Sequence, residues 1–307
     1  MENQPSPSLW SIDDRHRTRP TPTPPTQPLL PVDVVEDKKG VCGSETKTKA
    51  FDICTPKQSG GPVVLKPGLF AKNKERRKEL KQSSKEIVEL RPGMVHLKGY
   101  ISRTDQVKIV KKCRELGLGD GGFYQPGYED GTNLHLKMMC LGKNWDPQTS
   151  RYVDQRPSDG SVPPKIPHEF VTLVHSALKD SQTVTKLSNS KDLSLFSPDI
   201  CIVNFYSQNG RLGLHQDKDE SEPSIAAGLP VVSFSIGNSA EFLYGDERDV
   251  DKAEKVVLES GDVLIFGGKA RKVFHGVSAI KPEAPISLIE ETNLRKPGRL
   301  NLTFRQY

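Results

Sequence analysis

Residues 299–307, RLNLTFRQY, alternate between apolar and polar side chains as a β-strand does when one of its faces is buried. Successive side chains of a strand point to opposite faces. One face would then carry the apolar residues Leu300, Leu302 and Phe304. The other face would carry four polar residues, Arg299, Asn301, Thr303 and Arg305. The apolar face is typical of a core, whereas the two arginines opposite indicate either a binding site or a solvated surface.

Similar β-prone runs follow Asp199, separated by turn residues at the intervals of an all-β sandwich or barrel. They are DICIVNFY (199–206), PVVSFSIG (230–237), AEFLYG (240–245), KVVL (255–258), DVLIFGG (262–268), RKVFHGV (271–277) and PISLIEE (285–291). Two amphipathic segments before them predict helices over 104–117, with Thr104 as N-cap, and over 167–180. We therefore predict a mainly β fold with flanking helices, in which a barrel or jelly-roll core is covered on one side.

The first 87 residues differ in composition from the rest. They contain the proline-rich stretch RPTPTPPTQPLLP and the basic run KNKERRKELK. Such a segment cannot bury enough apolar surface to offset its ordering entropy, so we predict that residues 1–87 are disordered. Residues 88–198 and 199–307 are predicted to form one structural domain. The basic run is interpreted as a solvated helix in preference to a phosphate-binding arm.

Charge and cysteine content narrow the class of protein. The 307 residues carry a formal net charge of +5, which is compatible with a polyanionic partner. Five scattered cysteines without a CxxC pair predict reduced thiols and an intracellular protein. No run approaches the roughly 18 apolar residues of a membrane span, so no membrane partner is expected. We expect a monomer in the nucleus or cytoplasm, with an organelle as an open alternative.

A metal site is indicated by two segments. LGLHQDKDE (212–220) places His215 and Asp217 on the same side of an extended segment, and KVFHGV places His275 in a later strand. Two histidines and a carboxylate on one face of a metal form the triad of non-haem Fe(II) oxygenases, which leaves positions open for a co-substrate and O₂. An H-x-D pair alone is common, and a lone strand histidine is usually a core or surface residue.

The arginines of 299–307 support the metal interpretation. At a rise of about 3.3 Å per residue, the Cα atoms of Arg299 and Arg305 stand roughly 20 Å apart. Arginine suits carboxylates through paired hydrogen bonds, and Asn301 on the same face would add a neutral donor. A dicarboxylate clamp beside an iron-type triad points to 2-oxoglutarate as co-substrate. The alternative for this strand alone is an exposed face with solvated arginines.

Together these segments resemble the AlkB family of Fe(II)/2-oxoglutarate-dependent dioxygenases, close to its bacterial members. The family signature combines H-x-D, a distal histidine and R-x-N-x-T-x-R. The segments that carry it here are NFYSQNGRLGLHQDKDE, GDVLIFGG, RKVFHGV and RLNLTFRQ. The resemblance implies a double-stranded β-helix (jelly-roll) core over 199–307, preceded by helices and a nucleotide-recognition lid within 88–198. The longer connection EETNLRKPG departs from the bacterial pattern and would reshape one rim of the site.

The resemblance also implies roles for individual residues. Asn204 and Tyr206 would join Arg299, Asn301 and Arg305 in binding 2-oxoglutarate. Arg299 would meet its distal carboxylate, and Arg305 the carboxylate nearer iron.

Four further residues are implied to contact the substrate. Asp219 would accept a hydrogen bond from the exocyclic amine of the target base, a group that a carboxylate can recognise. Trp145 and Tyr152 would be lid aromatics that stack on the base and touch its phosphate. Arg248 would face the base or the backbone. Without the resemblance, Trp145 is interpreted as a packing residue and Asp219 equally well as a loop carboxylate.

The sequence thus predicts an oxidative demethylase that removes N-methyl groups from bases in DNA or RNA. It would use Fe(II), O₂ and 2-oxoglutarate and release succinate, CO₂ and formaldehyde. The target base must be single-stranded or flipped out of its duplex. The alternatives are a 2-oxoglutarate-dependent protein hydroxylase or demethylase, and a non-catalytic nucleic-acid-binding module. The sequence leaves open DNA or RNA, and 1-methyladenine, 3-methylcytosine or N6-methyladenine.

Overall fold

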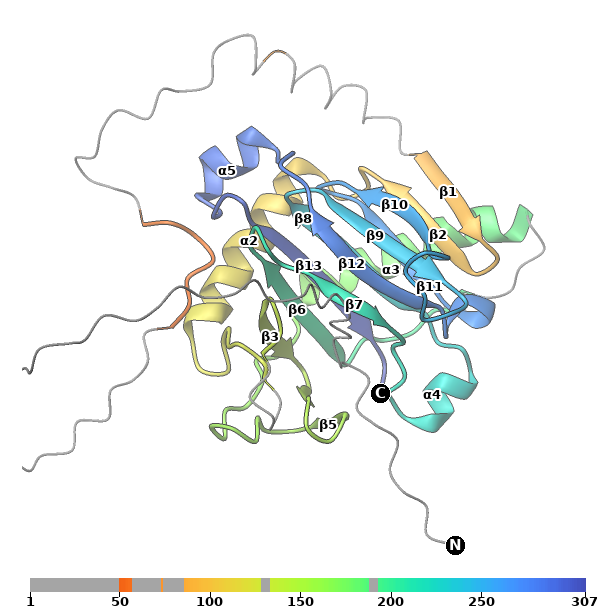
Figure 1. Ribbon diagram of the computed structural model, residues 1–307, viewed down its shortest axis with the longest axis horizontal. Coiled ribbons are helices and arrows are strands. Elements are labelled where there is room, and N and C mark those ends of the chain that lie inside the picture. Colours follow the sequence, from red (N-terminus) through yellow and green to blue (C-terminus); the bar gives the residue numbers. More distant parts are fainter. Residues whose placement is uncertain (1–49, 57–72, 74–85, 128–132, 188–192) are drawn as a thin grey trace, which may run out of the picture. The chain divides into compact units, whose positions relative to one another are not determined.

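The structure, a computed structural model, describes residues 50–56, 73, 86–127, 133–187 and 193–307. In these ranges strands form two larger sheets and a hairpin (Figure 1). The seven-stranded sheet has the order β1 (Glu86–Arg91), β2 (Met94–Lys98), β11 (Val263–Phe266), β8 (Val231–Gly237), β13 (Arg299–Arg305), β6 (Ile200–Tyr206) and β3 (Lys137–Leu141). The four-stranded sheet has the order β10 (Glu254–Leu258), β9 (Ala240–Gly245), β12 (Phe274–Ile280) and β7 (Leu212–His215). The hairpin pairs β4 (Asn144–Asp146) with β5 (Arg151–Val153).

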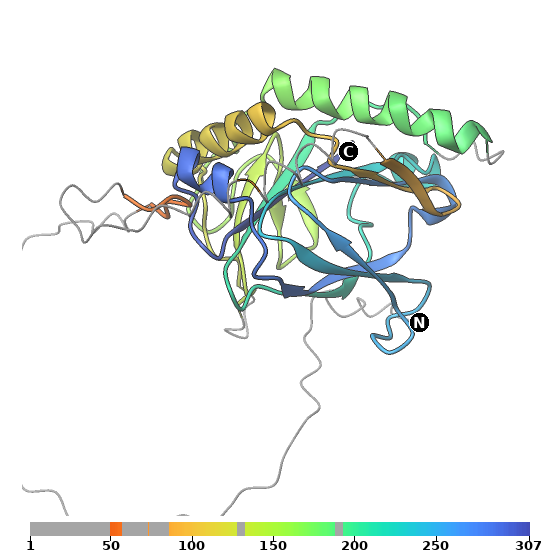
Figure 2. The ribbon, with the colours of Figure 1, turned by 90° about the horizontal axis from the view of Figure 1, so that it is seen from above.

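The seven-stranded sheet is buried on both faces. Toward one face, its side chains form an apolar cluster with α2 (Arg103–Leu118) and α3 (His168–Leu187). Toward the other, they form a second cluster with the four-stranded sheet. Figure 2 shows the two helices running over one face of the sheet. The predicted mainly β fold with helices on one side is therefore confirmed. None of the described helices is long and apolar enough to cross a membrane.

The strand β13 has the predicted alternation. Leu300, Leu302 and Phe304 are fully buried in the cluster on the helix side. The strand lies in the middle of the sheet and pairs with β6 on one side and β8 on the other. Its polar face must consequently point between the two sheets, because β-strand side chains alternate.

The start of α2 differs from the prediction. Ser102, not Thr104, is the N-cap, and its Oγ accepts a hydrogen bond from the backbone N–H of Asp105 at 3.1 Å. A serine in this position satisfies one of the free N–H groups of the first turn. The helix is amphipathic as predicted, and Val107 and Val110 lie on its buried face.

One predicted strand is wrong. The run PISLIEE forms a short helix, α5 (Ile286–Thr292), which packs against α2. Leu288 is fully buried. The hydroxyl of Thr292 donates to the carbonyl oxygen of Leu288 at 2.7 Å. Asn293 then ends the helix in the left-handed region with a φ of 56°, which asparagine tolerates. A short apolar run fits a strand and a buried helix equally well, so its pattern alone could not decide. Two shorter elements are α4 (Glu222–Ala226) and η1 (Gly268–Ala270).

Residues 50–56 correct the predicted boundary of disorder. Ile53 and Cys54 are buried, and the carbonyl of Ile53 accepts from the N–H of Arg295 at 3.0 Å. The carboxylate of Asp52 binds Arg114 of α2 at 2.7 Å. The prediction of disorder over 1–87 is thus wrong for this segment. Its few apolar side chains pack against residues that are distant in the sequence. Apart from Asn73 and the start of β1, the remainder of that region lies outside the described residues.

We expect Ile53→Ala to lower the free energy of unfolding by about 2 kcal/mol or more, because removing a buried Ile side chain leaves a cavity. Urea unfolding followed by circular dichroism measures the effect. Thr55→Ala, at an exposed position of the same segment, should stay within about 0.5 kcal/mol of the parent chain. Equal stabilities of the two variants would show that the segment does not pack in solution.

Candidate functional site

The polar face of β13 forms one wall of a cavity between the two sheets. Asn301, Thr303 and Arg305 line this cavity, which encloses about 750 Å³ including its open mouth. Asn301 Nδ2 donates to Ser233 Oγ at 2.7 Å, and the hydroxyl of Thr303 donates to Asn301 Oδ1 at 3.2 Å. The polar face is therefore organised around a cavity and is not a solvated surface.

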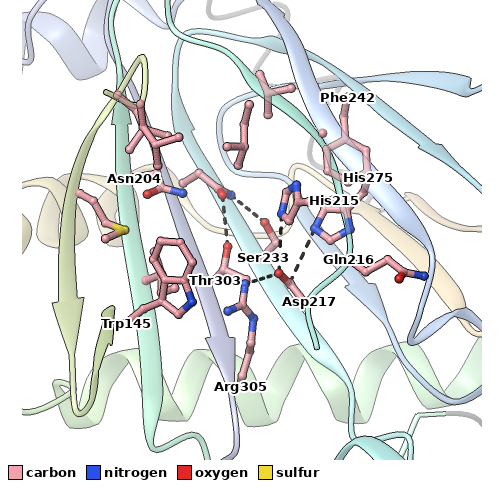
Figure 3. Close-up of a pocket in the computed structure, with 18 of the residues that line it drawn as sticks. Trp145, Asn204, His215, Gln216, Asp217, Ser233, Phe242, His275, Thr303 and Arg305 are labelled. Carbon is pink, nitrogen blue, oxygen red and sulfur yellow. Dashed lines mark hydrogen bonds and ion pairs between the residues drawn. The ribbon is translucent and has the colours of Figure 1, made fainter. Parts of the chain in front are cut away.

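His215, Asp217 and His275 meet at this cavity (Figure 3). His215 Nε2 lies 3.7 Å from Asp217 Oδ1, and His275 Nε2 lies 3.6 Å from Asp217 Oδ2. One potential ligand atom from each residue lies within 4.8 Å of the others, and all three residues are buried. The structure thus brings together the three residues that the sequence predicted as metal ligands.

Strand pairing explains this convergence. His215 ends β7 and is the direct partner of His275 in β12, and Asp217 follows two residues after His215. The two strands approach closely because residue 276 is a glycine. A Cβ atom at Gly276 would lie only 2.6 Å from the carbonyl oxygen of Leu212. The sequence His-Gly after residue 274 therefore has a structural reason as well as a chemical one.

Backbone carbonyls orient both imidazole rings. His215 Nδ1 lies 2.9 Å from the carbonyl oxygen of Gly213, and His275 Nδ1 lies 3.2 Å from that of Val273. In the tautomer that carries the N–H on Nδ1, each ring donates to one of these oxygens and keeps the lone pair of its Nε2 for a metal. This arrangement is the usual support of metal-binding histidines.

The charges at the cluster suit a divalent cation. Burial, followed by the neighbouring His275, lowers the pKa of His215 to about 3, and burial also lowers the pKa of His275. Burial alone would raise the pKa of Asp217, but Arg305 and the two histidines outweigh it, and the net pKa is well below its usual range. Arg305 Nη2 lies 2.7 Å from Asp217 Oδ1. Neutral imidazoles beside an ionised carboxylate are the protonation states that bind metal.

An indole and a second carboxylate also line the cavity. Figure 3 shows Trp145 across the cavity from the two histidines. Its Nε1–H donates to Asp219 Oδ2 at 2.9 Å. Apolar side chains of the strand β3 and the loop before it, among them Leu136 and Met138, complete this wall. The predicted substrate residues Trp145 and Asp219 therefore lie where a planar group could enter.

Comparisons with known proteins place the chain in a family. The profile of the 2OG-Fe(II) oxygenase superfamily matches residues 93–305. The chain belongs to this superfamily. Its members use Fe(II) and 2-oxoglutarate, which confirms the predicted cofactors.

Relatives of this oxygenase are AlkB proteins. It is 61% identical over 278 residues to the DNA N(6)-methyladenine demethylase ALKBH1C of Arabidopsis thaliana, in a match covering 88% of this chain and 60% of that one. It is 40% identical over 222 residues to the alpha-ketoglutarate-dependent dioxygenase AlkB of Salmonella typhimurium, covering 71% and 91%. The solved structure of OsALKBH1 matches with a TM-score of 0.68 at 58% identity, covering 72% of this chain and all of that one. The predicted AlkB resemblance and jelly-roll core are confirmed, although the oxygenase spans only about 60% of the plant relative.

The residues of this oxygenase fit both cofactors. Two histidines and an aspartate are the donor set of non-haem Fe(II). Asn204 and Tyr206 of β6 line the cavity beside Asn301. Asn204 Oδ1 is buried and accepts no hydrogen bond within the described residues. A buried polar atom without a partner normally meets one from a ligand or water. The cavity therefore offers polar groups that a keto-diacid would bind beside the triad.

The two arginines of β13 differ in exposure to the cavity. Arg305 lines it next to Asp217, and its predicted contact with the carboxylate nearer iron stays a prediction. Arg299 does not line it: its guanidinium donates to Ser235 Oγ at 2.8 Å and to the carbonyl of Asn238 at 3.2 Å. Burial lowers the pKa of Arg299 to about 10. Its predicted contact with the distal carboxylate stays a prediction.

Two predicted substrate residues lie outside the cavity lining. Tyr152 is buried, and its hydroxyl accepts a hydrogen bond from Arg305 Nη1 at 2.5 Å. Tyr152 thus contacts Arg305, which lines the cavity. The side chain of Arg248 donates through Nε to the carbonyl of Leu214 at 3.0 Å. The predicted contacts of these two residues with the substrate stay predictions.

Sequence reasoning missed a buried ion network around the triad. Glu220 lies 2.9 Å from Arg271 Nη2 and 3.2 Å from Arg305 Nε, with all three side chains less than 10% exposed. Arg271 also donates to the carbonyl oxygen of Asp217 and, at 2.8 Å, to that of Leu229. Glu220 belongs to the charged stretch QDKDE, which has no periodicity to mark one residue as buried. The position of Glu220 three residues after Asp217 of the H-x-D motif was the one sequence feature that could have indicated a role at the site.

Proposed function

We propose that this oxygenase removes N-methyl groups from nucleic-acid bases by oxidation. The observation that carries the proposal is the cavity itself, which has the His-Asp-His cluster on one side and an indole with a carboxylate on the other. Aromatic faces stack on bases, and a carboxylate recognises an exocyclic amine. The name of the Arabidopsis relative, a DNA N(6)-methyladenine demethylase, supports the same substrate class.

Different residues of the cavity would bind the metal, bind the co-substrate and exclude water. Bound Fe(II) and 2-oxoglutarate would supply the activation of O₂, so that a methylated base, O₂ and 2-oxoglutarate yield the bare base, formaldehyde, succinate and CO₂. His215, Asp217 and His275 would hold the metal, and Arg305 keeps Asp217 ionised and in place. Arg305 and Asn301 would receive the co-substrate, while Trp145 and the apolar wall exclude water from the reacting groups.

A nucleic acid is the proposed partner, in single-stranded form or with its target base flipped out. A base within a duplex cannot reach a buried metal cluster. The three residues of the cluster are buried and line the cavity, so the methyl group would be delivered by an extruded base.

The function is tested with single-stranded DNA and RNA oligonucleotides that carry one 1-methyladenine, 3-methylcytosine or N6-methyladenine. Mass spectrometry of the released nucleosides, together with formaldehyde and succinate assays, should show loss of the methyl group in step with succinate formation. Turnover stimulated only by peptides would assign the chain to protein modification. Oligonucleotide binding without succinate formation would assign it to non-catalytic binding. Either result would overturn the proposal.

Tyr152→Phe should raise the KM for 2-oxoglutarate by about three- to tenfold, because Arg305 loses a hydrogen bond that holds its guanidinium. Steady-state succinate formation at varied 2-oxoglutarate measures the change. Tyr244→Phe removes a tyrosine hydroxyl that binds Glu254 at the edge of the smaller sheet, and should leave this KM unchanged. Equal KM values for both variants would remove Tyr152 from the co-substrate site.

A further inference from the structure

The hydrogen bond between Trp145 and Asp219 connects two parts of the cavity wall. Trp145 belongs to β4 and is 2% exposed. Its cross-strand partner in β5 is Tyr152, and its backbone N–H lies 3.5 Å from Cys140 Sγ of β3. Asp219 belongs to the loop after β7, which is a strand of the four-stranded sheet. A side chain that is fixed by the hairpin thus donates to a side chain on a loop.

The two oxygens of Asp219 have different surroundings. Oδ2 accepts the indole N–H of Trp145 at 2.9 Å. No hydrogen bond or ion pair to Oδ1 is found within the described residues, and Asp219 lines the cavity. The terminal torsion of an aspartate is broad and roughly two-fold, so a carboxylate on a loop can present either oxygen in many orientations. A fixed donor on one oxygen restricts this freedom and determines where the other oxygen points.

We propose that Trp145 is a positioning residue: its N–H holds one oxygen of Asp219 and so directs the other oxygen into the cavity, where the AlkB resemblance places the exocyclic amine of the base. An ionised carboxylate only accepts hydrogen bonds. It therefore attracts an amine and repels a carbonyl oxygen. This inference rests on the proposed function, because it concerns the base that the same cavity receives.

A matched pair of bases tests the preference. 3-Methylcytosine and 3-methylthymine both carry the methyl group on N3, but their adjacent exocyclic groups are an amine and a carbonyl. The ratio of kcat/KM for the two bases, measured in otherwise identical single-stranded oligonucleotides, reports the selectivity. Trp145→Phe keeps an aromatic ring and removes the N–H. We expect it to lower this ratio about fivefold, the effect of one hydrogen bond, mainly through slower turnover of 3-methylcytosine.

Two further variants separate positioning from general packing. Asp219→Asn should lower the ratio at least as much as Trp145→Phe, because it replaces one acceptor oxygen by a donor. Tyr124→Phe removes a buried hydroxyl near β3 that has no hydrogen-bond partner among the residues that the structure describes, and should leave the ratio unchanged. If Trp145→Phe slows both bases equally, the residue only packs the lid, and the inference is wrong.

Binding gives a readout that does not depend on turnover. Fluorescence anisotropy with the metal-free protein should show tighter binding of the 3-methylcytosine oligonucleotide, and Trp145→Phe should reduce that difference. If the parent chain releases no formaldehyde from any base, the proposed function fails, while the binding preference still decides the role of Trp145. Equal binding of both oligonucleotides by the parent chain would overturn the inference.

Discussion

Replacing His215 with alanine is expected to abolish 2-oxoglutarate turnover and leave oligonucleotide binding largely intact. The imidazole supplies one of three ligand atoms that lie within 4.8 Å of one another. Loss of an outer-shell partner already costs about 10–100-fold in metal affinity or activity, so loss of a direct ligand should cost at least roughly 100-fold. Succinate and formaldehyde are measured at high Fe(II), and affinity is measured by fluorescence anisotropy.

A second histidine provides the control for this experiment. His175 lies on an exposed part of α3, and its Nε2 contacts the carbonyl of Phe196 at 3.0 Å. His175→Ala should retain activity, which excludes a general effect of the substitution. Demethylation that persists in His215→Ala at the level of the parent chain would contradict the assignment of the metal ligands. Equal loss of turnover and of oligonucleotide binding would instead indicate unfolding.

The fold was largely predictable where burial of one face imposes a regular alternation of apolar and polar residues on the sequence. The alternation in 299–307 correctly predicted which side chains of β13 join the core, because a strand between two layers must separate them by face. The pattern gave the wrong element for PISLIEE, because seven residues are too few to distinguish the apolar period of a helix from that of a strand. Contact with α2 selects the helix. The prediction of disorder was also wrong for Ile53, because the side chain is buried against residues that lie far away in the sequence.

The candidate site was predictable where spacing is combined with a distinctive residue type. His215 and Asp217 are two residues apart, and His275 is placed opposite by strand register. The side-chain contacts of Tyr152 were not predictable, because the β4–β5 hairpin determines that its hydroxyl meets Arg305 and not the cavity. Pairwise contacts between distant loops leave no period in the sequence.

Glu220→Ala should be among the most destabilising single changes near the triad. The substitution leaves Arg271 and Arg305 without the carboxylate that lies between them. Removing one partner from a buried ion pair costs about 3–5 kcal/mol, because the remaining charge is desolvated and uncompensated. In a domain of this size the apparent melting temperature should fall by roughly 10 °C. Differential scanning calorimetry of the metal-free protein measures it.

Two companion variants show whether charge is the cause. Glu247→Ala removes an exposed carboxylate 2.6 Å from Lys252, with both side chains 63% exposed, and should change stability by less than about 1 kcal/mol. Glu220→Gln fills nearly the same volume as glutamate but carries no charge. If the glutamine variant is as stable as the parent chain, the loss in Glu220→Ala comes from a cavity and the ion network contributes little. A loss shared by both substitutions assigns the effect to the missing charge between the two guanidinium groups, one of which holds Asp217.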